Sequence, residues 1–121
     1  VLTAAPPGAT RVDPVLLLKL LFGRGLRSVL AEGGSEVLGS LFDHGLVDEA
    51  VVFLAPILVG GESAPSAIGG HGADSPNVAP RLLDPTAQPI GNDLLIRGRV
   101  RRPSLSGEPP PEALPFTIEA N

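Results

Sequence analysis

The sequence contains no cysteine, methionine, tryptophan or tyrosine, and four phenylalanines are its only aromatic residues. Without cysteine the chain has no disulfide framework, no thiolate metal ligand and no thiol nucleophile. Only two histidines are present in 121 residues, so a histidine-rich metal site is also disfavoured and we expect no metal. No apolar run reaches the roughly 18 residues of a membrane-spanning helix.

Positive charge is also scarce, with nine Lys and Arg residues against 13 Asp and Glu residues and a net charge of -4. This balance disfavours general binding to nucleic acids or to anionic membranes. The N-terminus lacks the charged region of a signal peptide, so we expect a cytoplasmic protein. The chain begins with Val1 rather than with methionine, which leaves open that it is a fragment of a longer protein.

Glycine and proline are abundant, with 15 and 14 residues respectively, which together approach the composition of disordered chains. However, 43% of the residues are apolar and only 18% are charged. Such a chain can bury enough apolar surface to form a core, and its length fits one domain. We therefore expect a folded chain whose glycines and prolines are concentrated in turns and loops.

Helices and strands are expected to alternate over the first half of the chain. Asp13-Pro14 is typical of a helix start, and the helix that follows is apolar on nearly every side, which predicts that it is buried. A continuous apolar segment, 50–55, predicts a strand covered on both faces. The expected order is a helix over 14–22, a strand over 27–31, a helix over 34–43 and a strand over 50–55. This order predicts an α/β fold with parallel neighbouring strands.

The second half of the chain predicts a long loop followed by a hairpin. Residues 60–80 are rich in glycine and proline, and a loop of this length is usually functional or disordered. Strands are expected over 81–88 and 93–101, joined by a turn at Gly91-Asn92 in an antiparallel hairpin. We divide the chain into a domain over 1–102 and a Pro-rich tail over 103–121, in which 114–119 could form an edge strand.

The segment from Ser28 to Ser35 has the strongest functional pattern. A strand runs into Glu32-Gly33-Gly34, and a helix starts directly afterwards. The amino end of a helix offers unpaired N–H groups and a partial positive charge, and glycines allow a phosphate to approach the backbone. The spacing is not that of the GxGxxG dinucleotide fingerprint. An ordinary strand–helix turn that needs glycine for its shape is the alternative.

Several charged residues have both a functional and a plain interpretation. Glu32 follows the carboxyl end of a strand, where ligands bind in open α/β sheets, but it could equally be a solvent-facing turn residue. Asp48 and Glu49 could be paired carboxylates, although adjacent strand residues face opposite ways, which favours a solvated strand entry. The arginines of the last hairpin strand could hold a phosphate, but an exposed sheet face is the favoured interpretation; they are Arg97, Arg99 and Arg101.

Four segments in order resemble a known family. They are Leu21 to Gly34 (LFGRGLRSVLAEGG), Leu46 to Glu49 (LVDE), Ala55 to Gly61 (APILVGG) and Gly91 to Ile96 (GNDLLI). Their order and separations are similar to those of the C-terminal reductase domain of the bifunctional riboflavin biosynthesis deaminase/reductase. The resemblance covers roughly residues 2–101. It implies a dihydrofolate-reductase-like fold with a mixed, mainly parallel sheet and a C-terminal antiparallel hairpin.

The resemblance also implies a function. Members of that family use NADPH to reduce a ribosylaminopyrimidine 5-phosphate to its ribitylamino form, with hydride transfer to the sugar C1. By carry-over, Gly33, Gly34 and Ser35 would lie against the NADPH phosphates, and Glu32 would orient the nicotinamide and ribose as the candidate catalytic residue. A homodimer is expected by the same analogy. The family's domain begins before the position of Val1, so we expect the chain to be incomplete there and inactive alone.

Two other functions remain open at this stage. One is a related oxidoreductase with the same fold and another pteridine- or pyrimidine-like substrate. The other is a non-catalytic module, in which the apolar strand and the hairpin serve assembly and the glycine turn is only structural.

Overall fold

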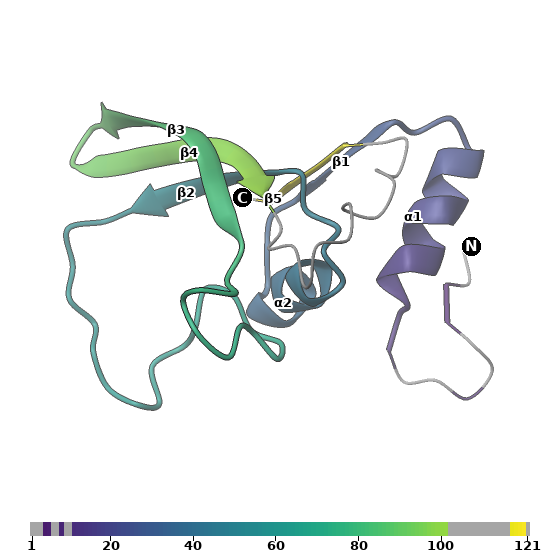
Figure 1. Cartoon of the computed structure of the whole chain (residues 1–121), viewed down its shortest axis with the longest axis horizontal. Coiled ribbons are helices and arrows are strands. Elements are labelled where there is room, and N and C mark those ends of the chain that lie inside the picture. The colour runs from purple at the N-terminus through teal and green to yellow at the C-terminus, as the bar shows by residue number, and fades with distance from the viewer. Residues whose placement is uncertain (1–3, 6–7, 9–10, 102–116, 121) are drawn as a thin grey trace.

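The computed structural model describes residues 4–5, 8, 11–101 and 117–120, and it contains two helices and a five-stranded sheet over these residues (Figure 1). In chain order the elements are α1 (Pro14–Gly23), β1 (Ser28–Ala31), α2 (Ser35–Asp43), β2 (Glu49–Leu54), β3 (Arg81–Ile90), β4 (Asp93–Arg101) and β5 (Thr117–Ala120). The expected positions of the first four elements and of the hairpin are thus confirmed, with shifts of one or two residues at several ends. Most of the Pro-rich tail lies outside the described residues.

The sheet is mixed, with strand order β1-β5-β2-β4-β3. Strand β5 pairs in parallel with β1 and with β2, whereas β4 pairs antiparallel with β2 and with β3. The antiparallel pairings are the longer ones, so the expected mainly parallel sheet is not confirmed. The structure also places the last strand between β1 and β2 rather than at an edge, and β1 and β2 are therefore not direct neighbours.

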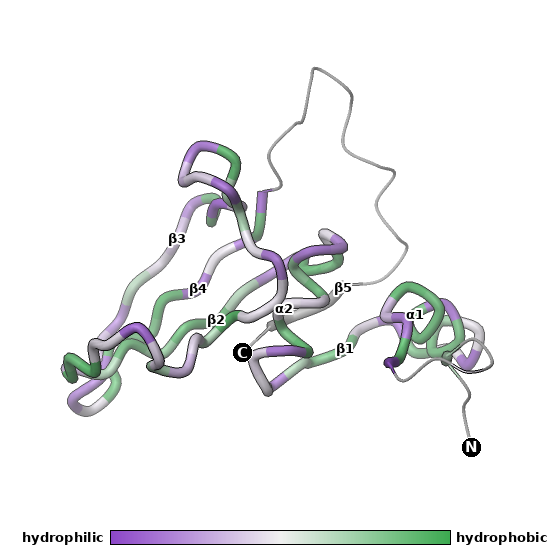
Figure 2. The backbone as a smooth tube through the Cα atoms, turned by 90° about the horizontal axis from the view of Figure 1, so that it is seen from below, coloured by the Kyte–Doolittle hydropathy of each residue, from purple (hydrophilic) through white to green (hydrophobic). Residues whose placement is uncertain are grey.

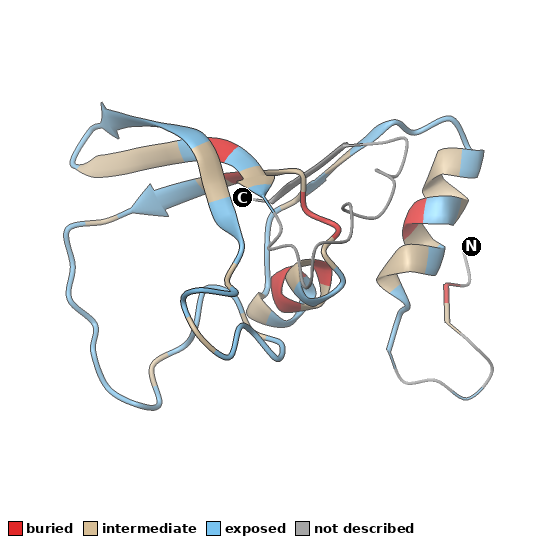
Figure 3. Cartoon of the chain, viewed as in Figure 1, coloured by how far each residue is buried: buried red, intermediate tan, exposed pale blue. Residues whose placement is uncertain are grey.

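Helix α1 begins as the sequence predicts. The side chain of Asp13 accepts a hydrogen bond from the N–H of Leu16 at 3.0 Å, and Pro14 occupies the first helical position. The expectation that this helix is buried is wrong, because Leu18 alone is fully buried and Leu16 is 37% exposed. Among the described elements, α1 lies at one end of the sheet and only one of its sides is covered (Figure 3).

The core lies where α1, α2 and the entry to β2 meet. Its buried members are Leu18, Leu38, Leu41, Leu46 and Val47. Figure 3 shows buried stretches in α1, in α2 and in the segment that leads into β2. Half-buried Val29 and Ala31 of β1 pack against the same cluster. This small core fixes α2 under the sheet and thereby sets the direction in which the chain leaves β1.

Strand β2 is covered only at its beginning. Ala50 is buried, but Val52, Phe53 and Leu54 are 44%, 53% and 56% exposed. The expectation of a strand covered on both faces is therefore wrong for its second half. The reason lies in the pairing: β5 pairs with β2 only at Glu49 and Ala50, and α2 lies below the first half of the strand (Figure 1).

Leu41 and Leu26 provide a matched test of this core. Leu41 is 7% exposed inside the cluster, whereas Leu26 is 50% exposed between α1 and β1. Leu41→Ala should lower the free energy of unfolding by about 2–5 kcal/mol, because it removes buried methyl groups and leaves a cavity. Leu26→Ala should change it by less than about 1 kcal/mol. Urea unfolding of both variants checks the prediction, and equal losses would contradict the assigned core.

Candidate functional site

The turn between β1 and α2 has the backbone shape that its glycines allow. Gly33 has φ +139° and Gly34 has φ +37°, and L-residues with a side chain rarely adopt either conformation. A Cβ atom added at either residue would meet no atom of the described chain within 4 Å. The backbone conformation of the turn therefore requires these two glycines, and the space beside the turn is open to a ligand.

The amino end of α2 is left open by its capping residue. Gly34 occupies the N-cap position and offers no side-chain acceptor, in contrast to Asp13 at α1. Helix geometry leaves the first N–H groups, those of Ser35 and Glu36, without an intrahelical acceptor. The same end carries the positive end of the helix dipole. The turn thus combines unused donors, positive potential and free space, which suits a phosphate group.

Glu32 directly follows the last residue of β1 and is exposed to solvent. It precedes the two glycines, so the structure brings all four predicted site residues together in one turn, with Ser35 half-buried as the first residue of α2. A carboxylate at this place can accept hydrogen bonds from a sugar or an amide.

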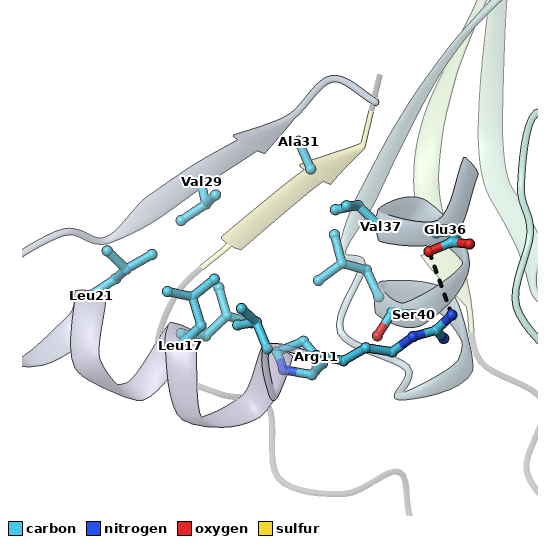
Figure 4. Close-up of a pocket in the computed structure, with 12 residues that line it drawn as sticks. Arg11, Leu17, Leu21, Val29, Ala31, Glu36, Val37 and Ser40 are labelled. Carbon is cyan, nitrogen blue, oxygen red and sulfur yellow. Dashed lines mark ion pairs between the residues drawn. The ribbon is translucent and has the colours of Figure 1, made fainter. Parts of the chain in front are cut away.

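An apolar pocket of about 420 Å³ lies beside this turn, between α1, β1 and the first two turns of α2 (Figure 4). Aliphatic side chains line most of it, including Leu17, Leu21 and Val29, and at its polar rim Arg11 and Glu36 form an ion pair at 3.6 Å. Both charged side chains are about 80% exposed, so the pair contributes little stability. Glu32 and the two glycines do not line the pocket. This cavity is therefore separate from the glycine turn.

Two charged residues of the sheet, Glu49 and Arg97, form an ion pair. Two of the three guanidinium nitrogens of Arg97, Nε and Nη2, donate to the carboxylate of Glu49, and the bond from Nη2 is 3.0 Å long. Glu49 and Arg97 lie on β2 and β4, where Val51 is the register partner of Arg97, so the contact is a diagonal cross-strand pair. This geometry supports the plain interpretation of Glu49 and Arg97 as strand residues.

The two histidines have separate surroundings. His44 follows α2, and its Nδ1 lies 2.8 Å from the carbonyl oxygen of Ser40. His71 lies in the long loop, and its Nδ1 is 3.3 Å from Oδ2 of Asp43. No group of three or more potential metal ligands occurs within the part of the chain that the structure describes. None of its helices is long and apolar enough to cross a membrane.

Asp43 is a residue that the sequence patterns did not single out. Its carboxylate accepts hydrogen bonds from the N–H groups of His71, at 2.8 Å, and Gly72, at 3.1 Å. The hydrogen bond from His71 is the main cause that lowers the pKa of Asp43 below its usual value. Asp43 and His71 are 28 positions apart, so no local pattern links them. A glycine inside a helix, Gly39, was the one available sign of a close contact on this helix.

The chain is similar to known proteins over most of its length. Residues 1–96 match the family model described as the RibD C-terminal domain. A 2,5-diamino-6-ribosylamino-4(3H)-pyrimidinone 5′-phosphate reductase of Methanothermobacter thermautotrophicus is 39% identical over 78% of this chain and 44% of its own length. The riboflavin biosynthesis protein RibD of Bacillus amyloliquefaciens is 41% identical over 66% of this chain and 22% of its own length.

A plant relative extends the similarity. The chloroplastic riboflavin biosynthesis protein PYRR of Arabidopsis thaliana is 29% identical over 86% of this chain and 16% of its own length. The chain therefore spans less than half the length of each of these relatives. The names of all three relatives refer to riboflavin biosynthesis or to a reductase of a ribosylaminopyrimidine phosphate.

Gly33 and Gly23 test the conformational role of the turn. An added Cβ would meet nothing within 4 Å at either residue, but only Gly33 has a positive φ. Gly33→Ala should therefore lower the free energy of unfolding by about 1–3 kcal/mol through backbone strain alone. Gly23 lies in α1, so Gly23→Ala should leave the free energy of unfolding unchanged or raise it slightly. Urea unfolding distinguishes them, and equal stability of the two variants would show that the turn does not require glycine.

Proposed function

Because the chain belongs to the family of RibD C-terminal domains, we propose that the protein carrying it is an NADPH-dependent reductase of riboflavin biosynthesis. Its substrate in this proposal is a ribosylaminopyrimidine 5-phosphate, which it reduces to the ribitylamino form. The observation that carries the proposal is the family match over residues 1–96, which includes the whole β1–α2 turn. The mixed sheet fits the dihydrofolate-reductase-like fold that we assign to this family.

The geometry of the turn supports a place for a dinucleotide. The open space beside Gly33 and Gly34 is what a bound phosphate requires, and the N–H groups at the start of α2 receive no side-chain cap from Gly34. We assign Gly33, Gly34 and Ser35 to the phosphates of NADPH. When bound, the cofactor supplies the hydride that reduces the sugar C1, and the protein contributes position and electrostatics.

We assign Glu32 an orienting role at the same edge of the sheet. Its carboxylate follows β1 directly and can accept hydrogen bonds from ribose hydroxyls or from the nicotinamide amide. Holding two reactants in a productive geometry lowers the barrier without covalent attack by the protein. The adjacent glycine turn keeps this carboxylate next to the site of the phosphates.

The remainder of the site is assigned to parts of the protein outside this chain. The chain spans 44% of the reductase relative, so more than half of that relative has no counterpart here. We therefore expect no NADPH-dependent turnover by the isolated 121-residue chain. The cytoplasmic location predicted from the sequence stays a prediction.

The substitution Glu32→Gln tests the assignment in the full-length protein. It keeps the size of the side chain but removes the charge, and it should lower kcat by about 10-fold to 100-fold while changing the NADPH Kd by less than about threefold. Glu62→Gln is the matched control, because Glu62 is an exposed glutamate of the loop after β2 and makes the same change away from the turn. NADPH oxidation with the ribosylaminopyrimidine phosphate and cofactor titration by fluorescence give both quantities.

The outcomes separate the competing functions. Unchanged turnover of Glu32→Gln would remove Glu32 from the site and leave the reductase proposal standing. Absence of NADPH binding by the wild-type full-length protein would contradict the reductase proposal and favour the assembly module. Oxidation of NADPH with a different pyrimidine or pteridine only would favour the related oxidoreductase.

We also propose that the protein forms a homodimer. Apolar side chains are exposed at the carboxyl end of β2 and in the segment after it: Val52, Phe53, Leu54, Ile57, Leu58 and Val59. Figure 2 shows hydrophobic stretches along β2 and β4 on the side of the molecule away from α1. Large apolar side chains exposed together in one short segment support an interface there.

A charge at Leu58 tests the dimer. Leu58→Glu in the full-length protein should shift the sedimentation equilibrium toward monomer, because a carboxylate would be desolvated in the interface. Leu26→Glu is the matched control, since Leu26 is 50% exposed between α1 and β1. A wild-type protein that sediments as a monomer would contradict the dimer.

A further inference from the structure

Helix α2 and the segment over residues 66–72 of the long loop touch each other through their backbones. A Cβ atom added at Gly39, in the middle of α2, would lie 2.3 Å from the carbonyl carbon of Gly69 and 2.5 Å from the nitrogen of Gly70. An added Cβ at Gly69 would lie 3.0 Å from the carbonyl oxygen of Ser35. The contact is thus too close for a side chain at Gly39, and it is tight at Gly69.

Hydrogen bonds hold the same segment at both ends of α2. At the amino end, the N–H of Gly69 donates to the carbonyl oxygen of Ser35 at 2.9 Å. At the carboxyl end, Asp43 accepts from the N–H groups of His71 and Gly72. The side chain of Asp43 is only 19% exposed, whereas that of His71 is 98% exposed. The carboxylate of Asp43, the last residue of the helix, therefore anchors the loop segment through two hydrogen bonds.

The segment depends on these contacts because it buries little apolar surface of its own. Ile68 is 45% exposed, and Ser66 donates to the carbonyl oxygen of Ile68 within the segment itself. Helix α2 is also short, with nine residues, and a helix of this length is not stable without tertiary contacts. Each of the two elements therefore holds the other in position.

We propose that the 66–72 segment fixes the amino end of α2 against the site of the cofactor, and that Asp43 is a positioning residue for NADPH binding. Ser35 is the residue through which the two are linked, because its carbonyl oxygen accepts the hydrogen bond from the segment and Ser35 itself directly follows the glycine turn as the first residue of the helix. This inference rests on the reductase function proposed above. It adds Asp43 to the residues that act on cofactor binding, although Asp43 lies at the carboxyl end of the helix and does not touch the cofactor in this proposal.

The test compares Asp43→Asn with Asp74→Asn in the full-length protein. Asparagine has the shape of aspartate, but its amide presents a donor to one of the two loop N–H groups, so part of the anchor is lost. Asp74 is an exposed aspartate of the same loop and supplies the matched loss of charge. Two readouts are measured: hydrogen exchange of the Val37 and Leu38 amides without NADPH, and the Kd for NADPH.

The amides of Val37 and Leu38 donate to the carbonyl oxygen of Gly34 at the start of α2. Asp43→Asn should accelerate hydrogen exchange at these two amides by about tenfold and raise the NADPH Kd by a similar factor. Because no reacting group is altered, kcat at saturating NADPH should stay within about twofold. Asp74→Asn should change none of the three. If Asp43 contributed to overall stability alone, the NADPH Kd of the folded Asp43→Asn variant would be unchanged.

A second pair of variants keeps the proposal testable if Asp43→Asn does not fold. Gly39→Ala leaves Asp43 in place but forces the segment away from the helix, whereas Gly23→Ala adds the same methyl group where there is open space. Gly39→Ala should reproduce the loss of NADPH affinity and Gly23→Ala should not. Unchanged affinity in Gly39→Ala, or faster exchange without loss of affinity in Asp43→Asn, would overturn the positioning role.

These outcomes are distinct from failure of the proposed function. If the wild-type protein binds no NADPH, the reductase proposal and the positioning role fail together. The exchange measurement needs no cofactor, so it still decides whether the segment holds α2. If the wild-type protein binds NADPH and both variants bind it equally well, the positioning role alone fails.

Discussion

Only three residues separate the end of β1 from the start of α2, and this short connection determines the geometry of the candidate site. Gly33 and Gly34 turn the chain through conformations that residues with a side chain rarely adopt. The turn leaves the helix without a side-chain cap, so its first N–H groups stay available. The same shape places Glu32 at the carboxyl end of β1. The uncapped amino end of α2 and a carboxylate therefore lie together as consequences of one turn.

The position of α2 is fixed from two sides. On one side Leu38 and Leu41 belong to the small core with α1 and the entry to β2. On the other side Gly39 allows the backbone of the 66–72 segment to lie directly on the helix, where Asp43 fastens it. Burial on one side and hydrogen bonding on the other compensate for the short length of the helix. A loop distant in sequence thereby contacts the helix that begins at the candidate site.

Local signals in the sequence were sufficient for the elements and for the glycine turn, but not for pairing or burial. Asp13-Pro14 predicted the start of α1, and the turn at Gly91-Asn92 predicted the start of β4. The insertion of β5 between β1 and β2 is a long-range pairing that no periodicity reports. The exposure of Phe53 follows from that pairing, since β5 accompanies β2 over its first residues only. The anchor at Asp43 escaped detection because its partners are 28 and 29 positions away.

The central claim is that the β1–α2 turn binds the phosphates of a nicotinamide dinucleotide. The most direct measurement is a titration of the ¹⁵N-labelled full-length protein with NADPH, followed through the backbone amide signals. The account predicts that the largest saturable shifts occur at Gly33, Gly34 and Ser35, which form the turn and the first residue of the helix. Saturable shifts elsewhere in the protein, with the signals of these three residues unchanged, would contradict it.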